Sequence, residues 1–152
     1  MGGGLTRPAA AAVVRQTAPV GPEELTAAAL DFLTERHLAT LTTFRSDGSA
    51  HVVPVGFTWD PDRGLARVIT SGTSQKVANL RRDPRAVLCQ LEGARWLTLE
   101  GAGTVRDDPA AVAEAVRRYA ARYRQPRENP ARVALEITVT RVLAGASLRP
   151  AA

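Results

Sequence analysis

The amino-acid sequence predicts a mainly β protein, an antiparallel β-barrel with helices at its rim. Its 152 residues suffice for one domain with one hydrophobic core. The predicted elements follow in the order helix, three strands, short helix, two strands, helix, strand. Turn signals join the strands where a parallel sheet would need helical crossovers, and this favours antiparallel pairing.

The domain is expected to begin at a helix. Residues 1–21 are rich in Gly, Ala and Pro, so we expect a disordered segment, and its stretch AAAAVV is too short for a signal peptide. The barrel domain then covers 22–148, followed by a tail at 149–152. A helix is predicted over 22–36, because Pro and two Glu fill its first turn and apolar residues recur at helical spacing.

A hairpin follows this helix. Asp47-Gly48 is a strong hairpin signal between the predicted strands 37–46 and 49–60. Pro54 lies within the second strand and lacks a backbone donor, so that strand should lie at an edge of the sheet or carry a bulge.

The other elements are read from the same signals of periodicity, capping and turns. They are a strand at 65–72, a short helix at 74–84, strands at 86–93 and 95–107, a helix at 108–124 and a strand at 131–148. The last strand alternates apolar and polar residues clearly, as a strand with one buried face does.

Composition narrows the class of partner. The net charge is +5, but the arginines are spread along the chain and not gathered in a basic tail, so we expect no nucleic-acid partner. No apolar run approaches the ~18 residues of a membrane span, so no membrane association is expected. Cys89 is the single cysteine, which suits the cytoplasm, and its apolar strand predicts a buried core residue.

Side chains for acid-base or metal chemistry are scarce. His37 and His51 are the only histidines, and neither has neighbours at the spacing of a metal site. His37 follows a helix end and suits a capping role. His51 faces either a pocket or solvent. No hydrolase or nucleotide-binding motif is present, so we predict no catalytic residue and no metal.

The stretch TSGTSQK, residues 70–76, is the strongest candidate for a binding site. It places hydroxyls and backbone amides at a helix start beside Lys76, the only lysine among 20 basic residues. Amides at a helix N-terminus and a compact ammonium both suit a phosphate, although a capped loop with a solvated lysine would look the same. Any phosphate here would belong to a cofactor that carries the chemistry.

These residues resemble a known family. A strand that ends in Thr70-Ser71, a helix that opens with SQK and the following NLRRDPRAVL resemble the pyridoxamine-phosphate-oxidase-like split barrels. The segments FLTERHLATLTTFRSDGSAHVVPVGFTWD and RWLTLEGAGTVRDDPAAVAEAVRRYAARYR fit the same pattern, so the resemblance covers residues 23–148. It implies an FMN-binding split β-barrel, a flavin or deazaflavin oxidoreductase, and a homodimer with both cofactors at the subunit interface.

Within that family the chain resembles the actinobacterial enzymes that use coenzyme F420. RHLATLTT, GTSQK, GARWLTLEG and RYRQPRENPARV resemble in particular the F420-dependent biliverdin reductases. Flavin-binding members carry basic residues, which grip the FMN phosphate, where His51, Gly56 and Gln75 stand here. Their replacement favours coenzyme F420, with FMN as the alternative. The C-terminal substrate motif of the vitamin oxidase has no counterpart in RVLAGASLRPAA.

The resemblance also implies roles for individual residues. Pro54 and Val55 would lie along the tricyclic ring, and Arg82 would meet the acidic tail. The ribityl and phosphate part would be held by Thr70, Ser71, Ser74, Gln75 and Lys76. Trp96 matches a position that reaches the cofactor from the partner subunit, although a cross-strand core aromatic is an equal alternative.

Three functions follow from the sequence. The first is hydride transfer from reduced coenzyme F420 to a conjugated small-molecule acceptor, with biliverdin converted to bilirubin. The second is a non-catalytic carrier of a flavin or tetrapyrrole. The third is an FMN-dependent oxidase. Visible general acids are absent under each hypothesis, so turnover with a reduced cofactor is the observation that separates them.

Overall fold

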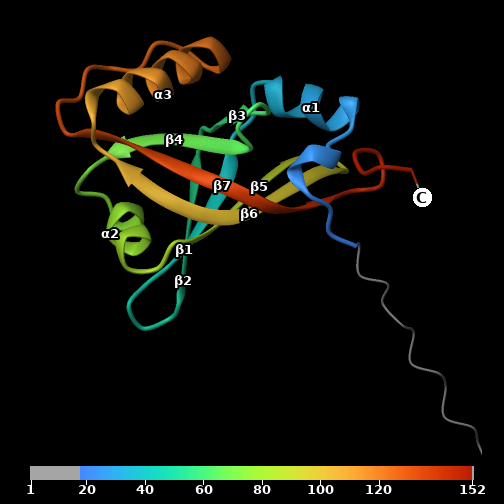
Figure 1. Ribbon diagram of the computed structural model, residues 1–152, viewed down its shortest axis with the longest axis horizontal. Helices are drawn as coiled ribbons and strands as arrows, with labels where there is room; N and C mark the ends of the chain where they lie inside the picture. The colour runs from blue at the N-terminus through green and yellow to red at the C-terminus, as the bar shows by residue number, and fades with distance from the viewer. Residues whose placement is uncertain (1–17, 152) are drawn as a thin grey trace, which may run out of the picture.

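One antiparallel sheet of seven strands, in the order β2-β1-β5-β6-β7-β4-β3, forms the frame of the protein (Figure 1). The computed structural model describes residues 18–151. The strands are β1 Ala39–Phe44, β2 Ala50–Val55, β3 Thr58–Asp60, β4 Leu65–Ser71, β5 Arg85–Glu92, β6 Arg95–Arg106 and β7 Arg132–Ala144. The helices are α1 Ala27–Thr34, α2 Gln75–Arg82 and α3 Pro109–Arg122, preceded by a 3-10 turn at Pro22–Glu24. The predicted mainly β, antiparallel architecture is confirmed.

The sheet is rolled so that its two edges approach each other. β2 and β3 occupy opposite edges, yet only Gly56 and Phe57 separate them in the chain. A link of that length cannot cross a flat sheet of seven strands ~4.8 Å apart, so the sheet must curl into a barrel that is split between β2 and β3. We call Gly56-Phe57 the seam.

The core lies inside this curl. Buried side chains such as Leu41 and Leu88 alternate with half-buried ones along β1 and β5, and the first half of β7, which includes Ile137, is buried on both faces. In Figure 1, α1 and α3 lie near β3, whereas α2 lies by the other end of the sheet. β4 ends at Ser71 and α2 begins at Gln75, so these two elements meet at the predicted TSGTSQK turn.

Two predicted elements are interrupted. The helix predicted over 22–36 is a 3-10 turn followed by α1, because Leu25 is extended and Thr26 starts a new helix by accepting a hydrogen bond from the Ala29 N–H at 3.1 Å. The strand predicted over 49–60 breaks at the seam into β2 and β3. The hairpin at Asp47-Gly48 is confirmed, with Gly48 at a φ of 84°.

Two other expectations need adjustment. Val20 forms a backbone bridge with Val142, with N···O distances of 3.0 and 2.8 Å, so domain contacts begin ahead of the expected boundary at residue 22. Most of the segment expected to be disordered, residues 1–17, lies outside the described residues. Cys89 is half-buried and alternates with the core residues Leu88 and Gln90, so it lies on the outer face of β5 and not in the core.

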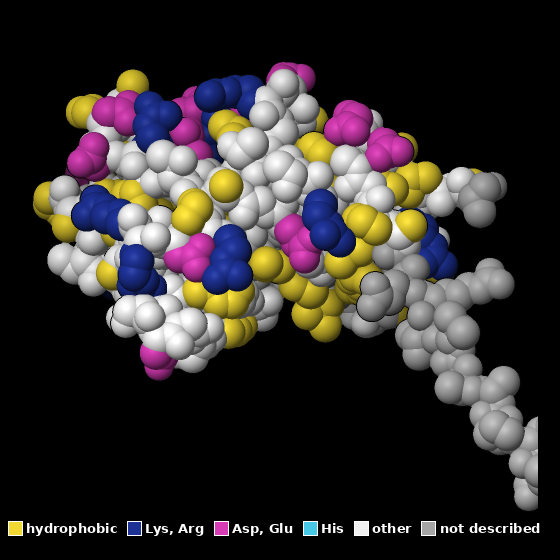
Figure 2. Space-filling model, turned by 60° about the horizontal axis from the view of Figure 1, so that its bottom comes forward, with side chains coloured by type: hydrophobic (Ala, Val, Ile, Leu, Met, Phe, Trp, Pro, Cys, Tyr) yellow, Lys and Arg dark blue, Asp and Glu magenta, His cyan; other side chains and the backbone are white. Residues whose placement is uncertain are grey.

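Charges on the surface are mixed in sign. Figure 2 shows Lys and Arg side chains close to Asp and Glu side chains on one face of the molecule. Ion pairs account for much of this mixing, including Arg85 with Asp83 at 2.7 Å and Arg141 with Glu100 at 3.2 Å. Within residues 18–151, no helix is long and apolar enough to cross a bilayer, and no group of three or more potential metal ligands is present.

Candidate functional site

A cavity of about 320 Å³ lies where β2 and β4 end, beside the start of α2. The segment that follows α3 closes another side. Its lining consists of Pro54, Val55, Gly56, Ile69, Thr70, Ser71, Lys76, Tyr119, Pro126, Asn129 and Arg132. This is the only described cavity to which Lys76 contributes, so we call it the Lys76 cavity.

Helix α2 holds Lys76 in place through a buried polar anchor. Asn79 is fully buried and donates a hydrogen bond of 3.0 Å to Thr43 Oγ1 on β1. Gln75 Nε2 donates in turn to Asn79 Oδ1 at 2.7 Å. Val77 and Leu80 pack into the core on the same helix. These contacts fix the first turn of α2, and Lys76 with it, against the barrel wall.

Lys76 is a half-buried cation without a partner. It forms no hydrogen bond or ion pair with any residue that the structure describes, and burial lowers the pKa of its ammonium from the ordinary value of 10.5. A buried charge that lacks a counter-ion is destabilising, and an anion in the cavity would relieve that penalty. The structure therefore supports Lys76 as an anion-binding residue.

Hydroxyl groups line the same cavity as the Lys76 ammonium. Thr70 Oγ1 donates to Ser74 Oγ at 3.2 Å, so Ser74 supports a residue of the cavity wall from behind. Ser74 is the N-cap of α2, and its side chain makes no capping bond. Ser71 Oγ accepts a hydrogen bond of 2.9 Å from Asn129 Nδ2. The cavity thus combines two cationic side chains, Lys76 and Arg132, with neutral donors, the composition that suits a phosphate ester.

The predicted site residues divide into two groups. Pro54, Val55, Thr70, Ser71 and Lys76 all line the cavity, while Ser74 and Gln75 support its wall.

The remaining two predicted residues, Arg82 and Trp96, do not line the cavity either. The guanidinium of Arg82 donates to the carbonyl of Phe44 at the end of β1 and to Asn79 Oδ1 at 3.4 Å. Trp96 is the second residue of β6. The neighbouring Leu97 pairs with Ala144 at the end of β7, whereas the cavity-lining Arg132 starts that strand. Trp96 therefore lies away from the Lys76 cavity of its own chain.

The segment that follows α3 supplies residues that motif analysis did not single out. Asn129 and Arg132 line the cavity, and the backbone N–H of Gly72 bonds the carbonyl of Ala131 at 2.8 Å. The signal was present in RYRQPRENPARV, a polar stretch with two prolines and neither helical nor strand periodicity. Its place against β4 depends on the tertiary fold, which local pattern does not reveal.

Gly56 lines the cavity. Because it has no side chain, two tyrosine rings can pack next to it. A Cβ at this position would lie 2.9 Å from Tyr119 Cε2 and 3.1 Å from Tyr123 Cε2. The two rings are themselves packed, with centroids 4.9 Å apart. Tyr123 is further held because its hydroxyl donates to the His37 carbonyl at 2.6 Å and accepts from the Phe57 N–H at 3.1 Å. A basic side chain therefore has no space at position 56.

His51 lies on the inward face of β2 and not toward solvent. It is half-buried, its Nδ1 has no hydrogen-bond partner among the described residues, and burial lowers its pKa, assisted by the charges of Arg45 and Lys76. Its imidazole is therefore biased toward the neutral form and adds no fixed charge beside Lys76.

Two further hollows adjoin Tyr119. One of about 410 Å³ is lined by Arg36, His37, Leu38, Tyr119, Tyr123 and Arg124, and one of about 280 Å³ by Tyr119, Arg124, Gln125, Pro126 and Arg127. Tyr119 also lines the Lys76 cavity, so the three hollows share one aromatic wall. Arginine is the only residue type with a permanent charge that lines the two outer hollows, which favours an anionic, flat occupant.

Comparison with known proteins places these features in a wider context. The family model described as pyridoxamine 5'-phosphate oxidase matches residues 25–144. The F420H(2)-dependent biliverdin reductase of Mycobacterium tuberculosis is 58% identical over 120 residues, which cover 79% of this chain and 88% of that protein.

Solved structures agree on the fold. A conserved hypothetical protein of Mycobacterium tuberculosis has a TM-score of 0.69 at 24% identity, over 80% of this chain and 86% of its own. A protein described as an F420 reductase has a TM-score of 0.63 at 22% identity, over 74% and 94% of the two chains. At these identities the structural likeness supports the architecture alone.

Proposed function

The chain belongs to the pyridoxamine 5'-phosphate oxidase family, and from this premise we propose that it is a coenzyme F420-dependent reductase whose acceptor is biliverdin. The observation that carries the proposal is Lys76, a half-buried cation that has no partner among residues 18–151 and lies in a cavity lined by hydroxyls. The high identity to an F420H(2)-dependent biliverdin reductase supports the choice of cofactor and of acceptor.

The cavity fits the phosphorylated part of the cofactor. Its volume of about 320 Å³ lies at the lower end of the range of ~300–1,000 Å³ for small-molecule pockets. Lys76 would hold the phosphate, and Thr70 and Ser71 would bond the ribityl hydroxyls. Pro54 and Val55 offer an edge strand with a missing donor, where a ring system can approach the backbone. The remainder of so large a cofactor would extend beyond this cavity.

FMN fits this chain less well. Position 56 has no space for a basic side chain, because Tyr119 and Tyr123 fill it. Gln75 is engaged with Asn79, and His51 is biased toward the neutral form. Lys76 is then the one permanent positive charge among the positions where the flavin-binding members hold phosphate.

The protein itself positions the cofactor and the acceptor and offers them a defined binding surface. Bound reduced coenzyme F420 supplies the hydride. The described residues of the cavity include no carboxylate, cysteine or histidine, so no side chain there stands out as a nucleophile or a general acid. The role of the lining residues is to bind and orient, which alone can lower a barrier substantially.

The outer hollows suit a conjugated, anionic acceptor. Tyr119 and Tyr123 offer aromatic faces, and Arg36, Arg124 and Arg127 offer guanidinium groups for carboxylates. Biliverdin has an extended conjugated system and two propionates, so both features have a counterpart. We place the acceptor in these hollows, next to the Lys76 cavity.

A homodimer would complete the site. Leu91 on β5 is 59% exposed and Val52 on β2 is 55% exposed, and the half-buried Trp96 pairs with Leu91 on the neighbouring strand. Burial of this apolar surface in a second copy would bring Trp96 toward the partner's cavity. Sedimentation at micromolar concentration checks this: a stable folded monomer would remove the dimer and the contribution of Trp96 across it.

An anaerobic assay tests the function. The protein is mixed with reduced coenzyme F420 and biliverdin, and the absorbances of cofactor and bilin are followed together. We expect both to change in a one-to-one ratio, with bilirubin as product.

Other results would point to the rival functions. Binding of the cofactor without oxidation would favour a carrier, and oxidation with other acceptors only would keep the class and discard biliverdin. Tight FMN binding with hydrogen peroxide formation would overturn the assignment.

A further inference from the structure

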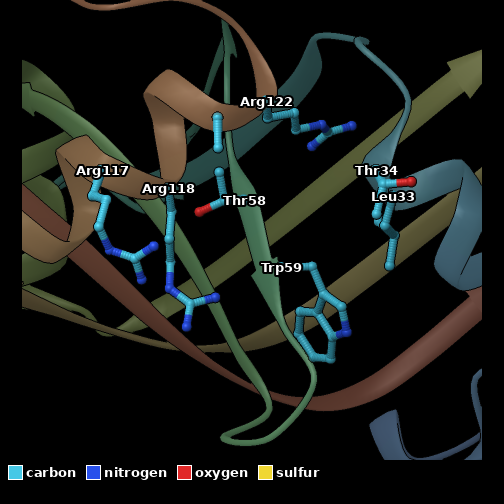
Figure 3. Close-up of a pocket in the computed structure, with 8 residues that line it drawn as sticks. Leu33, Thr34, Thr58, Trp59, Arg117, Arg118 and Arg122 are labelled. Atoms are coloured by element: carbon cyan, nitrogen blue, oxygen red, sulfur yellow. The ribbon is translucent and has the colours of Figure 1, made fainter.

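A second hollow, of about 400 Å³, opens between α1, β3 and α3 (Figure 3). It is lined by Leu33, Thr34, Thr58, Trp59, Arg117, Arg118, Ala121 and Arg122. None of these residues lines the Lys76 cavity or the hollows around Tyr119. We call it the β3 hollow. Its volume lies within the range of small-molecule sites.

Two of its arginines are neutralised by carboxylates. Arg117 and Arg118 each bond Glu114 at 2.7 Å, and Arg118 lies 3.2 Å from Asp60. Asp60 is buried and also pairs with the buried Arg67 at 2.8 Å. These charges form a network of alternating sign, so Arg117 and Arg118 bring little excess positive charge to the hollow.

Arg122 is different because all its hydrogen-bond partners are neutral. Its guanidinium donates to the carbonyl of Glu35 at 2.9 and 2.8 Å, to the carbonyl of Phe57 and to Gln90 Oε1 at 2.6 Å. Burial lowers the pKa of Arg122, as expected of a desolvated cation without a bonded carboxylate. The wall of the β3 hollow therefore holds one positive charge without a bonded counter-ion.

Two polar atoms on β3 also lack partners. Thr58 Oγ1 and Trp59 Nε1 are buried and form no hydrogen bond with any described residue. Thr58 is 6% exposed, and buried polar groups of this kind normally have partners. Figure 3 shows both side chains between Leu33 of α1 and the pair Arg117 and Arg118 of α3, with Arg122 above them. Leu33, Ala121 and the indole of Trp59 supply apolar surface.

We propose that the β3 hollow is a second ligand site, which takes a small monoanion with a flat apolar body, such as an aromatic carboxylate. The carboxylate would meet Arg122 and the Thr58 hydroxyl, since guanidinium and carboxylate form strong charge-assisted hydrogen bonds. The ring would lie against Trp59 and Leu33. The site is independent of the cofactor assignment, because it shares no residue with the Lys76 cavity.

Benzoate is the probe for the test, and neutral benzamide is its control. Binding is followed on the 15N-labelled full chain by the indole N–H signal of Trp59, identified by its loss in Trp59→Phe. We expect benzoate to shift this signal saturably, and benzamide to bind about tenfold more weakly because it lacks the charge. Absence of a saturable shift with benzoate would overturn the site, and equal binding of benzamide would overturn the role of the charge.

Variants locate the binding. Ala121 is exposed and lines the hollow, whereas Ala113 is exposed on the same helix and does not. Ala121→Met should weaken benzoate binding about tenfold by filling the hollow, and Ala113→Met should leave it unchanged. Lys76→Ala should bind benzoate as the wild type does. Unaltered binding by Ala121→Met, or its loss in Lys76→Ala, would refute the location.

Discussion

The side-chain amide of Asn129 donates a hydrogen bond of 2.9 Å to Ser71 Oγ, which joins the segment after α3 to the end of β4. Asn129 Oδ1 at the same time accepts from the Ala131 N–H at 3.0 Å, so the turn itself is fixed. Both Asn129 and Ser71 line the Lys76 cavity. One side-chain bond thus sets the distance between two of its walls.

Asn129→Ala should weaken the binding of coenzyme F420 about fivefold. The change removes a hydrogen bond worth ~1 kcal/mol and frees one wall of the cavity. Isothermal titration calorimetry measures the loss. Ser71→Ala should show a larger loss, because it also removes a hydroxyl placed at the ribityl part. The double variant should lose less than the sum, because each change breaks the bond between Asn129 and Ser71. Additive losses would show that the two residues act separately.

Lys76→Ala should weaken binding of the cofactor by ~1.5–3 kcal/mol, the range for a hydrogen bond to a charged group. Its control is Arg81→Ala, which removes an exposed cation from the same helix without touching the cavity. The control should bind as the wild type does. If Lys76→Ala binds coenzyme F420 with wild-type affinity, Lys76 does not hold the phosphate.

The ammonium of Lys76 should make stability depend on pH at the alkaline end. Burial lowers the pKa of Lys76 in the folded protein, so between that pKa and the unfolded value of 10.5 the unfolded chain binds more protons. The free energy of unfolding gained from this group therefore rises with pH in that window. Chemical denaturation of wild type and Lys76→Gln across the window measures it. As the pH rises through the window, the free energy of unfolding of the wild type should increase relative to that of Lys76→Gln. A difference that does not vary with pH would contradict the lowered pKa.

Gly56→Ala should destabilise the protein by ~1–3 kcal/mol through overpacking. The φ of Gly56 is not positive, so the backbone accepts alanine, and the cost is the contact of the new Cβ with Tyr119 and Tyr123. Thermal unfolding measures the effect. In a Tyr119→Leu background the loss should shrink, because the nearest ring is gone. A loss of the same size in that background would assign the cost to another contact.

The sequence predicted the strands well because their patterns are local. Asp47-Gly48 and the alternation of β7 each report on neighbouring residues, and the hairpin and the strand are both confirmed. Alternation did not reveal that residues 133–137 of β7 are buried on both faces. The break between β2 and β3 left no such signal. Gly56 and Phe57 continue an apolar run, and the chain leaves one edge of the sheet for the other there only because the barrel curls.

The site residues also divide into those that a local pattern revealed and those that only the tertiary fold brings to the cavity. Thr70, Ser71 and Lys76 were found because they share one turn, with a composition that has a chemical meaning. Asn129 and Tyr119 were missed because they reach the cavity from a helix and a segment about 50 residues further along the chain. Arg82 was predicted from the family resemblance, as a contact for the acidic tail of the cofactor. It lies six residues beyond Lys76 on α2, and its guanidinium turns to the end of β1.

The seam has a consequence for hydrogen exchange. The N–H of Phe57 bonds the hydroxyl of Tyr123, and its carbonyl accepts from Arg122, so both backbone groups depend on the last turn of α3. Helix ends fray at a fraction of the free energy of global unfolding. The Phe57 amide should then exchange with deuterium far sooner than the amides of β7. The barrel can open at this one point while its other strands stay paired, and a bound cofactor would slow that opening.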